Sequence, residues 1–295
     1  MNKKLLVAAI MAALTISTST TLAAPTFSGD ARILSQKDDG AHTYTDTRFR
    51  LNADSEISDG FYAHARIMGI DDQEGANLFA AAGTGSTGAG VNMDQMYIGT
   101  KVGAIDVKAG RQALWAGNGM LADISGIQGL SLATDTGNIG MDAFVGRSEG
   151  TDVTAANLKT KGEAVKFGLG YLKEENTNYW ALNADTKLTN NVVLSGNYVK
   201  NDTDNKNGFL VKATFGEAIH KGDFNYALSY RKIDDNAVKS DWTTDSAYNN
   251  SKGVRVEANY KVAENVSLNM YKDFTKTNDS NVGMNRAKAE MTVEF

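Results

Sequence analysis

The last nine residues of the chain, AKAEMTVEF (residues 287–295), alternate strictly between apolar and polar side chains. The apolar set is alanine, alanine, methionine, valine and phenylalanine, and the polar set is Lys288, Glu290, Thr292 and Glu294. Successive side chains of a β-strand point to opposite faces, so the segment predicts a strand with one apolar and one charged face. Because a slip of one residue would exchange the two faces, the register of this strand is well specified.

The same alternation recurs along the chain and is interrupted by clusters of Gly, Asn, Asp and Ser, which mark turns. Short and long connections alternate, which is typical of outer-membrane barrels whose long loops lie outside the cell. The segment 151–160 has the weakest pattern, but single-chain bacterial barrels have even strand numbers, and this favours including it. Sixteen strands are thus predicted, near residues 26–36, 45–54, 61–70, 94–102, 105–112, 127–134, 138–147, 151–160, 164–173, 179–188, 192–201, 208–215, 224–233, 252–262, 266–274 and 284–295.

The composition agrees with an all-β chain. Among 295 residues there is one proline, Pro25, and proline cannot donate to a β-ladder. There is no cysteine, which removes disulfides and thiolate chemistry. A formal net charge of −5 gives no reason to expect nucleic acid as a partner.

The N-terminus has the order of a secretory signal peptide. Lys3 and Lys4 precede an apolar stretch at residues 5–16, and small residues follow at 17–24. The apolar stretch is too short for a membrane-spanning helix. We expect a signal peptide at residues 1–23, cleaved after Ala23 or Ala24, and a barrel domain at residues 24–295.

No later segment is apolar enough to cross a membrane as a helix, so the chain requires a closed barrel if it lies in a membrane. Sixteen strands enclose a lumen wide enough for an aqueous channel. A soluble sandwich or propeller also alternates, but it usually carries a recurring motif, and the sequence shows none. The prediction is an all-β, transmembrane antiparallel β-barrel of 16 strands.

Short motifs resemble known proteins. The segment VGAIDVKAGRQ (residues 102–112) resembles the stretch of Gram-negative general porins that ends the fifth strand and enters the third loop. The terminal Phe295 resembles the aromatic end that the barrel-assembly machinery reads in that superfamily. The segments 47–53, 110–112 and 192–200, together with Arg66, are similar to porins of diderm Firmicutes.

This resemblance implies trimers of 16-stranded barrels, passive diffusion of small hydrophilic solutes through the outer membrane, and a third loop folded into the pore. The Firmicute porins usually carry an S-layer homology domain ahead of the barrel. Here the first predicted strand follows the signal peptide almost at once, so we do not carry over the peptidoglycan tether of that group.

A pore of this kind needs a constriction lined by opposing charges. Arg32, Arg48, Arg50 and Arg66 share the polar face of the first three predicted strands and lie near mid-strand, which predicts a basic wall at membrane mid-depth. The alternative is that they are scattered lumen charges. Lys108 also points inward by plain alternation.

The predicted third loop spans residues 113–127, and Asp123 is its only acid and our candidate for the opposing charge. Strict alternation points Arg111 outward, but a bulge at Gly110 could turn it inward, and the porin resemblance favours the lumen. Several arginines against one loop acid predict a weak preference for anions.

Small residues on the apolar face near the barrel closure allow close approach of a second protein surface. With the resemblance, they predict a homotrimer that uses the first strands and the last strand. The expected interface residues are Ala31, Ala63, Ala65, Gly69, Ala287 and Ala289.

Enzyme readings have little support. His42, His64 and His220 show no spacing typical of a metal site or a Ser-His pair, and we expect no catalytic residue, metal or cofactor. Calcium binding by polar loops such as residues 201–207 stays open. Three functions remain: a general diffusion porin, a channel selective for anions, phosphate or sugars, and a non-conducting structural or adhesive barrel.

Overall fold

The computed structural model describes residues 24–58, 60–72, 90–162 and 164–295. The predicted signal peptide at residues 1–23 lies outside the described residues. Among the described residues, no helix is long and apolar enough to span a bilayer.

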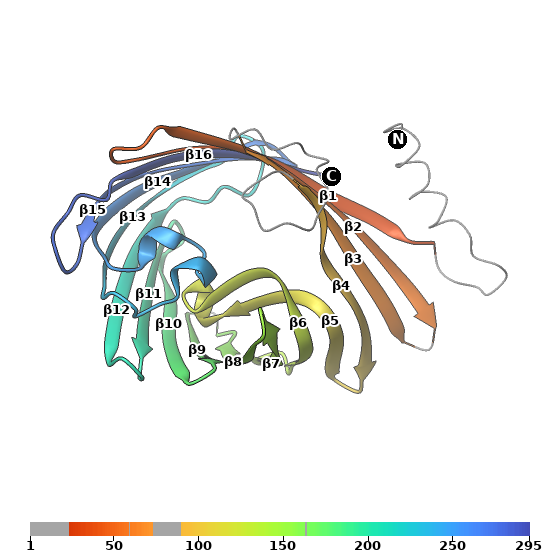
Figure 1. Ribbon diagram of the computed structural model, residues 1–295. Coiled ribbons are helices and arrows are strands. Elements are labelled where there is room, and N and C mark those ends of the chain that lie inside the picture. Colours follow the sequence, from red (N-terminus) through yellow and green to blue (C-terminus); the bar gives the residue numbers. More distant parts are fainter. Residues whose placement is uncertain (1–23, 59, 73–89, 163) are drawn as a thin grey trace.

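The chain forms a closed antiparallel barrel in which each strand pairs with its sequence neighbours and the last strand pairs with the first (Figure 1). In the described part of the chain, short 3-10 helices lie between strands: η1 (Gly117–Gly119), η2 (Ser240–Trp242) and η3 (Ser246–Tyr248). The strands are β1 (Thr26–Asp38), β2 (Thr43–Ser58), β3 (Phe61–Asp72), β4 (Gly90–Val102), β5 (Ile105–Ala116), β6 (Ala122–Asp135), β7 (Ile139–Ser148), β8 (Thr151–Thr160), β9 (Val165–Glu174), β10 (Thr177–Thr189), β11 (Val192–Asn201), β12 (Lys206–Phe215), β13 (Phe224–Ile233), β14 (Ser251–Ala263), β15 (Val266–Thr277) and β16 (Arg286–Glu294).

All sixteen predicted strands are confirmed, including the weakly patterned segment that forms β8. The largest difference lies at residues 113–127, which we expected to be a loop. The ladder continues there through the pairs Trp115↔Asp123 and Ala116↔Ala122, so β5 and β6 extend into a long hairpin with η1 at its tip. The segment that we expected to be the third loop is therefore a paired hairpin.

The barrel closes through the C-terminal segment at residues 287–295, which pairs with β1. Ala31 lies opposite Val293, and the backbone groups of Gly29 and Phe295 exchange hydrogen bonds of 2.8 and 3.0 Å. The Phe295 ring stacks on Phe49 with 5.7 Å between ring centroids. A Cβ atom at Gly29 would lie 2.7 Å from that ring, so glycine leaves the room for it.

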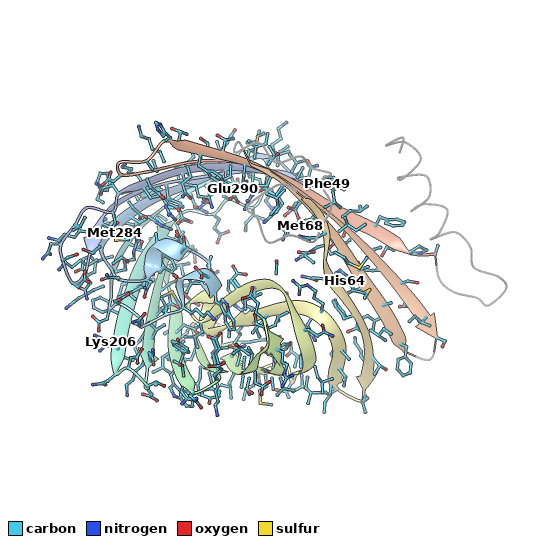
Figure 2. All side chains as sticks on the ribbon, in the orientation of Figure 1. Phe49, His64, Met68, Lys206, Met284 and Glu290 are labelled. Carbon is cyan, nitrogen blue, oxygen red and sulfur yellow. The ribbon has the colours of Figure 1, made fainter. Side chains whose placement is uncertain are left out.

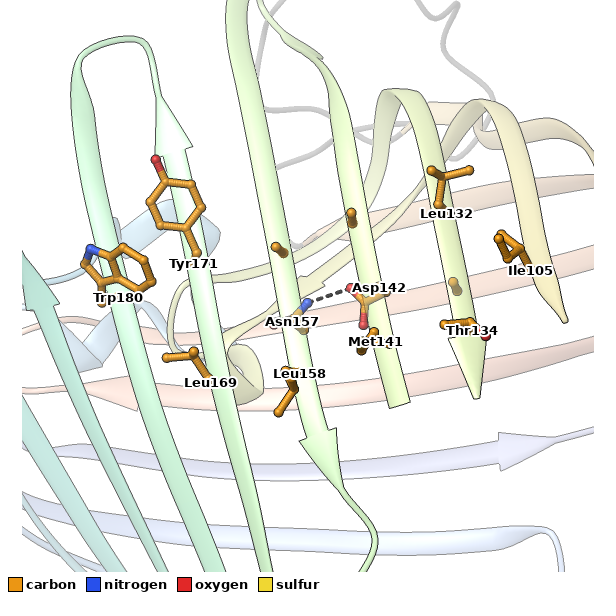
Figure 3. A pocket seen from close by; sticks show the side chains of 13 residues that line it. Ile105, Leu132, Thr134, Met141, Asp142, Asn157, Leu158, Leu169, Tyr171 and Trp180 are labelled. Carbon is orange, nitrogen blue, oxygen red and sulfur yellow. Dashed lines mark hydrogen bonds between the residues drawn. The ribbon is translucent and has the colours of Figure 1, made fainter. Parts of the chain in front are cut away.

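The outer face of the barrel is apolar. Large side chains such as Ile33, Leu182 and Leu228 are at least half exposed, which is stable only against hydrocarbon. Around the small residues of β7 and β8 the face is hollowed into a depression of about 510 Å³ (Figure 3). Its larger apolar lining residues are Ile105, Leu132, Met141, Leu158, Leu169 and Trp180.

Inside the barrel, part of the lumen is filled by a hydrophobic cluster. The β5–β6 hairpin and the connection between β13 and β14 lie within the barrel and contribute buried side chains to it (Figure 1). The inner faces of β7 to β11 and of β13 supply the rest. The inner faces of β1, β2 and β3 lie on the other side of the lumen from this filling, and they are charged.

Candidate functional site: a pore constriction

The predicted basic residues lie on adjacent strands of the inner wall. Arg32 of β1 is directly opposite Arg48 of β2, and Arg50 follows two residues later on the same face. Arg66 of β3 pairs with Asn52 of β2. Between 12% and 25% of each of these four arginine side chains is exposed, so their charges lie at the edge of the lumen.

Each of these arginines meets a carboxylate of the wall itself. Asp46 accepts two hydrogen bonds of 2.9 Å from Arg32, and Asp30 accepts from Arg48 at 3.0 Å and from Arg50 at 2.6 Å. Neither acid is among the predicted pore residues, although both lie two residues from an arginine on the same alternating face. The wall is thus a ladder of alternating charges and not a purely basic surface.

Arg66 is paired through a β-bulge. The register between β3 and β4 shifts after Arg66, and the consecutive residues Asp94 and Gln95 are both buried. Asp94 accepts from Arg66 at 2.6 Å, while Gln95 donates to the carbonyl oxygen of Ser125 at 2.7 Å. A bulge can direct two successive side chains to one side of a sheet, and here it ties the wall to the base of the hairpin.

The hairpin lies flat against the inner face of β8, β9 and β10. Leu114 and Leu121 are buried in the hydrophobic cluster, and Asn157 of β8 donates to the carbonyl oxygen of Trp115 at 2.8 Å and accepts from the amide of Gly117 at 3.0 Å. Figure 3 shows the further bond from Asn157 to Asp142. The expectation that the third loop folds into the pore is confirmed.

The alternate residues of the hairpin form its exposed face. Past Gly110, whose φ is +134°, β5 leaves the wall and turns inward. Because the strand has turned inward, the odd-numbered residues, which point outward in the first part of β5, now face the lumen. Trp115 is one of them, and 41% of it is exposed. Arg111 lies in this set, and its Nε donates to the carbonyl oxygen of Asp94 at 3.1 Å, beside Arg66.

The remaining predicted pore residues are more isolated. Lys108 lies on the wall 3.6 Å from Asp106 and above the ring of Tyr97. Asp123 is exposed on the hairpin, opposite Trp115 in the β5–β6 ladder. The arginines described above are paired by other carboxylates, so the role of Asp123 as an opposing charge stays a prediction.

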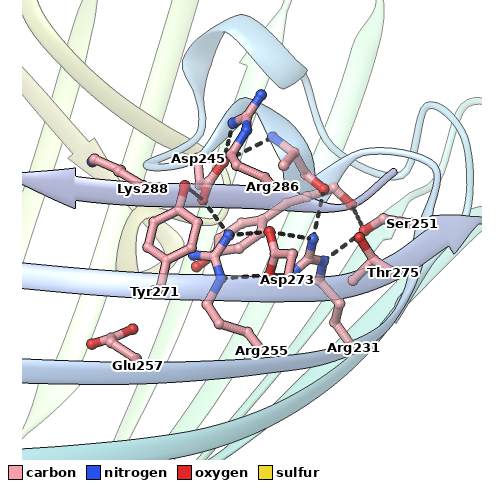
Figure 4. Close-up of polar contacts among 12 residues, drawn as sticks. Arg231, Asp245, Ser251, Arg255, Glu257, Tyr271, Asp273, Thr275, Arg286 and Lys288 are labelled. Carbon is pink, nitrogen blue, oxygen red and sulfur yellow. Dashed lines mark hydrogen bonds and ion pairs between the residues drawn. The ribbon is translucent and has the colours of Figure 1, made fainter. Parts of the chain in front are cut away.

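A second charged cluster lies on the inner wall of β13 to β16 (Figure 4). The carboxylate of Asp273 is fully buried and accepts from both Arg231 and Arg255, at distances from 2.7 to 3.3 Å. Asp245, in the connection between β13 and β14, accepts from Arg255 and Arg286. The alternation of polar and apolar residues could have predicted that Arg231, Arg255 and Arg286 point into the lumen. No local sequence pattern indicates that the connection between β13 and β14 folds into the lumen and brings Asp245 to them.

The small residues predicted for the trimer interface belong to one outer region around the closure. Ala287 and Ala289 pair with Lys37 and Ser35 of β1, the strand that also carries Ala31. Across β2, Ala65 pairs with Ala53, Ala63 with Ser55 and Gly69 with Phe49. Assembly into a trimer stays a prediction.

A closed barrel of sixteen antiparallel strands, with an apolar outer face, a charged inner face and a hairpin inside the lumen, is the architecture of an outer-membrane porin. The sequence matches no family model and no curated protein sequence. In structure, the chain is similar to two mutants of the porin of Rhodopseudomonas blastica, each at 10% identity and a TM-score of 0.67, over 92% of this chain and 100% of the other. A structure described under asymmetric conductivity of engineered proteins matches with 11% identity and a TM-score of 0.66 over the same shares. These similarities establish the porin fold.

Proposed function

We propose that this protein is an outer-membrane porin whose water-filled channel lets small hydrophilic solutes and ions diffuse passively. The observation that carries the proposal is the charged inner wall of β1 to β4 facing a lumen that a folded hairpin narrows. Charged groups inside a shell with an apolar exterior are stable where water solvates them, and a wet constriction lined by both signs of charge is a permeation path. The proposed action needs no chemical step and no cofactor.

We propose a weak preference for anions. The described wall residues near the hairpin include more basic than acidic groups, but the difference is small because most arginines are paired. The basic residues are Arg32, Arg48, Arg50, Arg66, Arg111 and Lys288. The acidic residues are Asp30, Asp46, Asp94, Glu290 and the exposed hairpin residue Asp123.

Conductance of the purified protein in planar lipid bilayers tests this function. We expect stepwise increases in current as open channels insert, and no saturable block of that current by small sugars or phosphate. In a salt gradient, the reversal potential should have the sign that shows anions to be the more permeant ions. Current block that saturates with one solute would favour a substrate-selective channel. Absence of conductance from folded protein would favour a structural or adhesive barrel, and clear cation selectivity would refute the anion preference.

We further propose export through the signal peptide, assembly by the barrel-assembly machinery through Phe295, and a homotrimer joined at the small-residue region. Mass spectrometry of the mature N-terminus tests the cleavage. For the trimer, Ala289→Trp on the proposed interface should reduce crosslinked trimer in membranes. The matched change Leu228→Trp, on the outer face of β13, should leave it intact. Equal yields of trimer from both variants would contradict this interface.

A further inference from the structure

The connection between β13 and β14 (residues 234–250) folds into the lumen. Strand connections usually run over the protein surface, where water satisfies their backbone groups. Here Ala237, Val238 and Trp242 are buried in the same hydrophobic cluster as Met120 and Leu121 at the tip of the β5–β6 hairpin. Two segments more than a hundred residues apart therefore share one core inside the barrel.

The connection touches the hairpin tip at Gly119. Its carbonyl oxygen accepts from the backbone N–H of Thr244 at 3.0 Å and from the Thr244 hydroxyl at 3.3 Å. Gly119 has a φ of +76°, and a Cβ atom built on it would lie 2.2 Å from the Thr244 hydroxyl oxygen. The fit between the two segments thus depends on the absence of a side chain at this position.

The residue after Thr244 fixes the connection to the barrel wall. The carboxylate of Asp245 accepts from Arg255 of β14 at 2.6 Å, from Arg286 of β16 at 3.1 Å and from the Tyr271 hydroxyl of β15 at 3.1 Å (Figure 4). It also accepts from the N–H of Ala247 at 2.9 Å, which caps η3. Charge-assisted bonds of this kind are about twice as strong as neutral ones.

The electrostatics of Asp245 agree with this anchoring. Burial alone would raise the pKa of its carboxyl group. The guanidinium groups of Arg255 and Arg286 and the N–H of Ala247 outweigh burial and hold the pKa below its usual value of 3.8. Asp245 therefore stays ionised at neutral pH in a place where it has several cationic partners.

A second set of bonds holds the end of the connection. Arg231 of β13 donates to the carbonyl oxygen of Ala247 at 3.2 Å and to the hydroxyl of Ser251 at 2.8 Å. That hydroxyl donates in turn to the carbonyl oxygen of Tyr248 at 2.7 Å. The other end is tied by Lys239, which forms an ion pair with Glu174 at the end of β9.

We propose that residues 234–250 act as a clasp that holds the hairpin tip in the lumen, and that Asp245 is the positioning residue that sets the constriction through Thr244 and Gly119. The proposal rests on the proposed pore function and deepens it, because it assigns the width of the channel to two segments instead of the hairpin alone. Pore diameter controls which solutes pass. Releasing the clasp should widen the constriction and let the hairpin tip move.

The first test compares two glycine variants by single-channel recording. Gly119→Ala adds a methyl group against Thr244, whereas Gly137→Ala adds one where no atom lies within 4 Å. Both glycines have positive φ, +76° and +87°, so the two substitutions strain the backbone to a similar extent. Only the substitution at Gly119 also brings a methyl group against Thr244. We expect the channel with Gly119→Ala to show a conductance raised roughly twofold and greater open-channel noise, because the constriction widens, while Gly137→Ala stays at the wild-type value.

The second test uses Asp245→Asn, with Asp241→Asn as its control because Asp241 is exposed on η2 in the same connection. Since the chain has no cysteine, Ala247→Cys provides a single buried thiol that reports the connection directly. We expect the thiol to react only slowly with a water-soluble maleimide, both in the Ala247→Cys single variant and in the double variant that also carries Asp241→Asn. It should react at least roughly tenfold faster when Asp245→Asn is also present, because local opening controls access.

These readouts separate the two proposals. A wild-type barrel that folds but does not conduct would defeat the pore function, and thiol protection would still decide whether the clasp exists. Wild-type conductance and noise in both Gly119→Ala and Asp245→Asn would overturn the clasp. Equal reactivity of the Ala247→Cys thiol with and without Asp245→Asn would also overturn the clasp. This second test remains available if the Gly119→Ala variant does not fold.

Discussion

The buried carboxylate of Asp273 offers the sharpest test of how the inner wall is held together. None of its surface is exposed, and it accepts four hydrogen bonds from two guanidinium groups. We consider Asp273→Ala, which removes all four acceptor contacts. Arg255 would keep Asp245 as a partner, and Arg231 would keep only the neutral acceptors at Ser251 and Ala247.

The expected cost follows from that inventory. Breaking a buried ion pair by removing one partner costs about 3–5 kcal/mol, because the other charge remains buried without compensation. Full burial means that solvent screening does not reduce this figure for Asp273. The repulsion between Arg231 and Arg255, which the carboxylate now offsets, acts in the same direction. We therefore expect the free energy of unfolding to fall by about 3–5 kcal/mol.

The measurement is guanidinium-induced unfolding of the protein refolded into lipid or detergent, followed by tryptophan fluorescence. The matched control is Asp152→Ala, which breaks the pair of Asp152 with Arg147 at 2.6 Å, both side chains being at least 70% exposed. Exposed pairs of this kind contribute little, so the control should unfold like the wild type. A loss below about 1 kcal/mol for Asp273→Ala, comparable to a surface pair, would refute the assignment of Asp273 as a buried structural charge.

Three further outcomes are expected. Replacing both Arg48 and Arg50 by Gln leaves the Asp30 carboxylate without its two partners, so the reversal potential in a salt gradient should move toward cations; an unchanged value would show that ions do not pass this wall. The folded-state pKa of Asp245 lies below its usual value of 3.8, so its contribution to stability is present above that pH and is lost as the pH falls through the lower folded value. Protection of the Ala247→Cys thiol against dithiodipyridine, which reacts with thiols in acid where maleimides do not, should then persist from neutral pH to about pH 4 and fall only below it, and release at pH 6 would contradict the assignment. Deleting Phe295 removes the ring that covers Gly29 and the last backbone bonds of the closure, so the yield of folded barrel in the outer membrane should drop, whereas an unchanged yield would remove its role as an assembly signal.

The strands could be predicted from the sequence because one physical rule governs all of them. In β16, lipid on one side and water on the other force a period of two, and the same rule applies to β2 and β14. Even the weak β8 follows, since closure requires an even number of strands. The rule also predicts inward arginines, because alternation alone decides the face on which Arg32 or Arg255 lies.

The partners of those arginines could be predicted only in part. Asp30 and Asp46 lie on the same alternating face as Arg32, so their pairing was within reach of the same rule. Asp94 faces inward because a β-bulge inserts one extra residue into β4, and the local alternation of side chains does not indicate a bulge. Asp245 lies in a connection, whose path depends on packing against Met120 and Leu121 rather than on any periodic pattern.

The pairing of the wall arginines decides how selective such a pore can be. A lone guanidinium acts on a passing ion over the full screening length of about 8–10 Å at physiological salt. A guanidinium paired with one carboxylate, as Arg32 is with Asp46 at 2.9 Å, acts at a distance as a dipole, and the field of a dipole falls faster than that of a charge. Asp30 is shared by Arg48 and Arg50, so that cluster keeps a single net positive charge. The ladder of β1 and β2 therefore orients nearby solutes strongly while it attracts ions at the centre of the lumen only weakly. This accounts for expecting a weak anion preference in a chain whose formal net charge is −5, because the local imbalance at the wall, and not the total, acts on the ion.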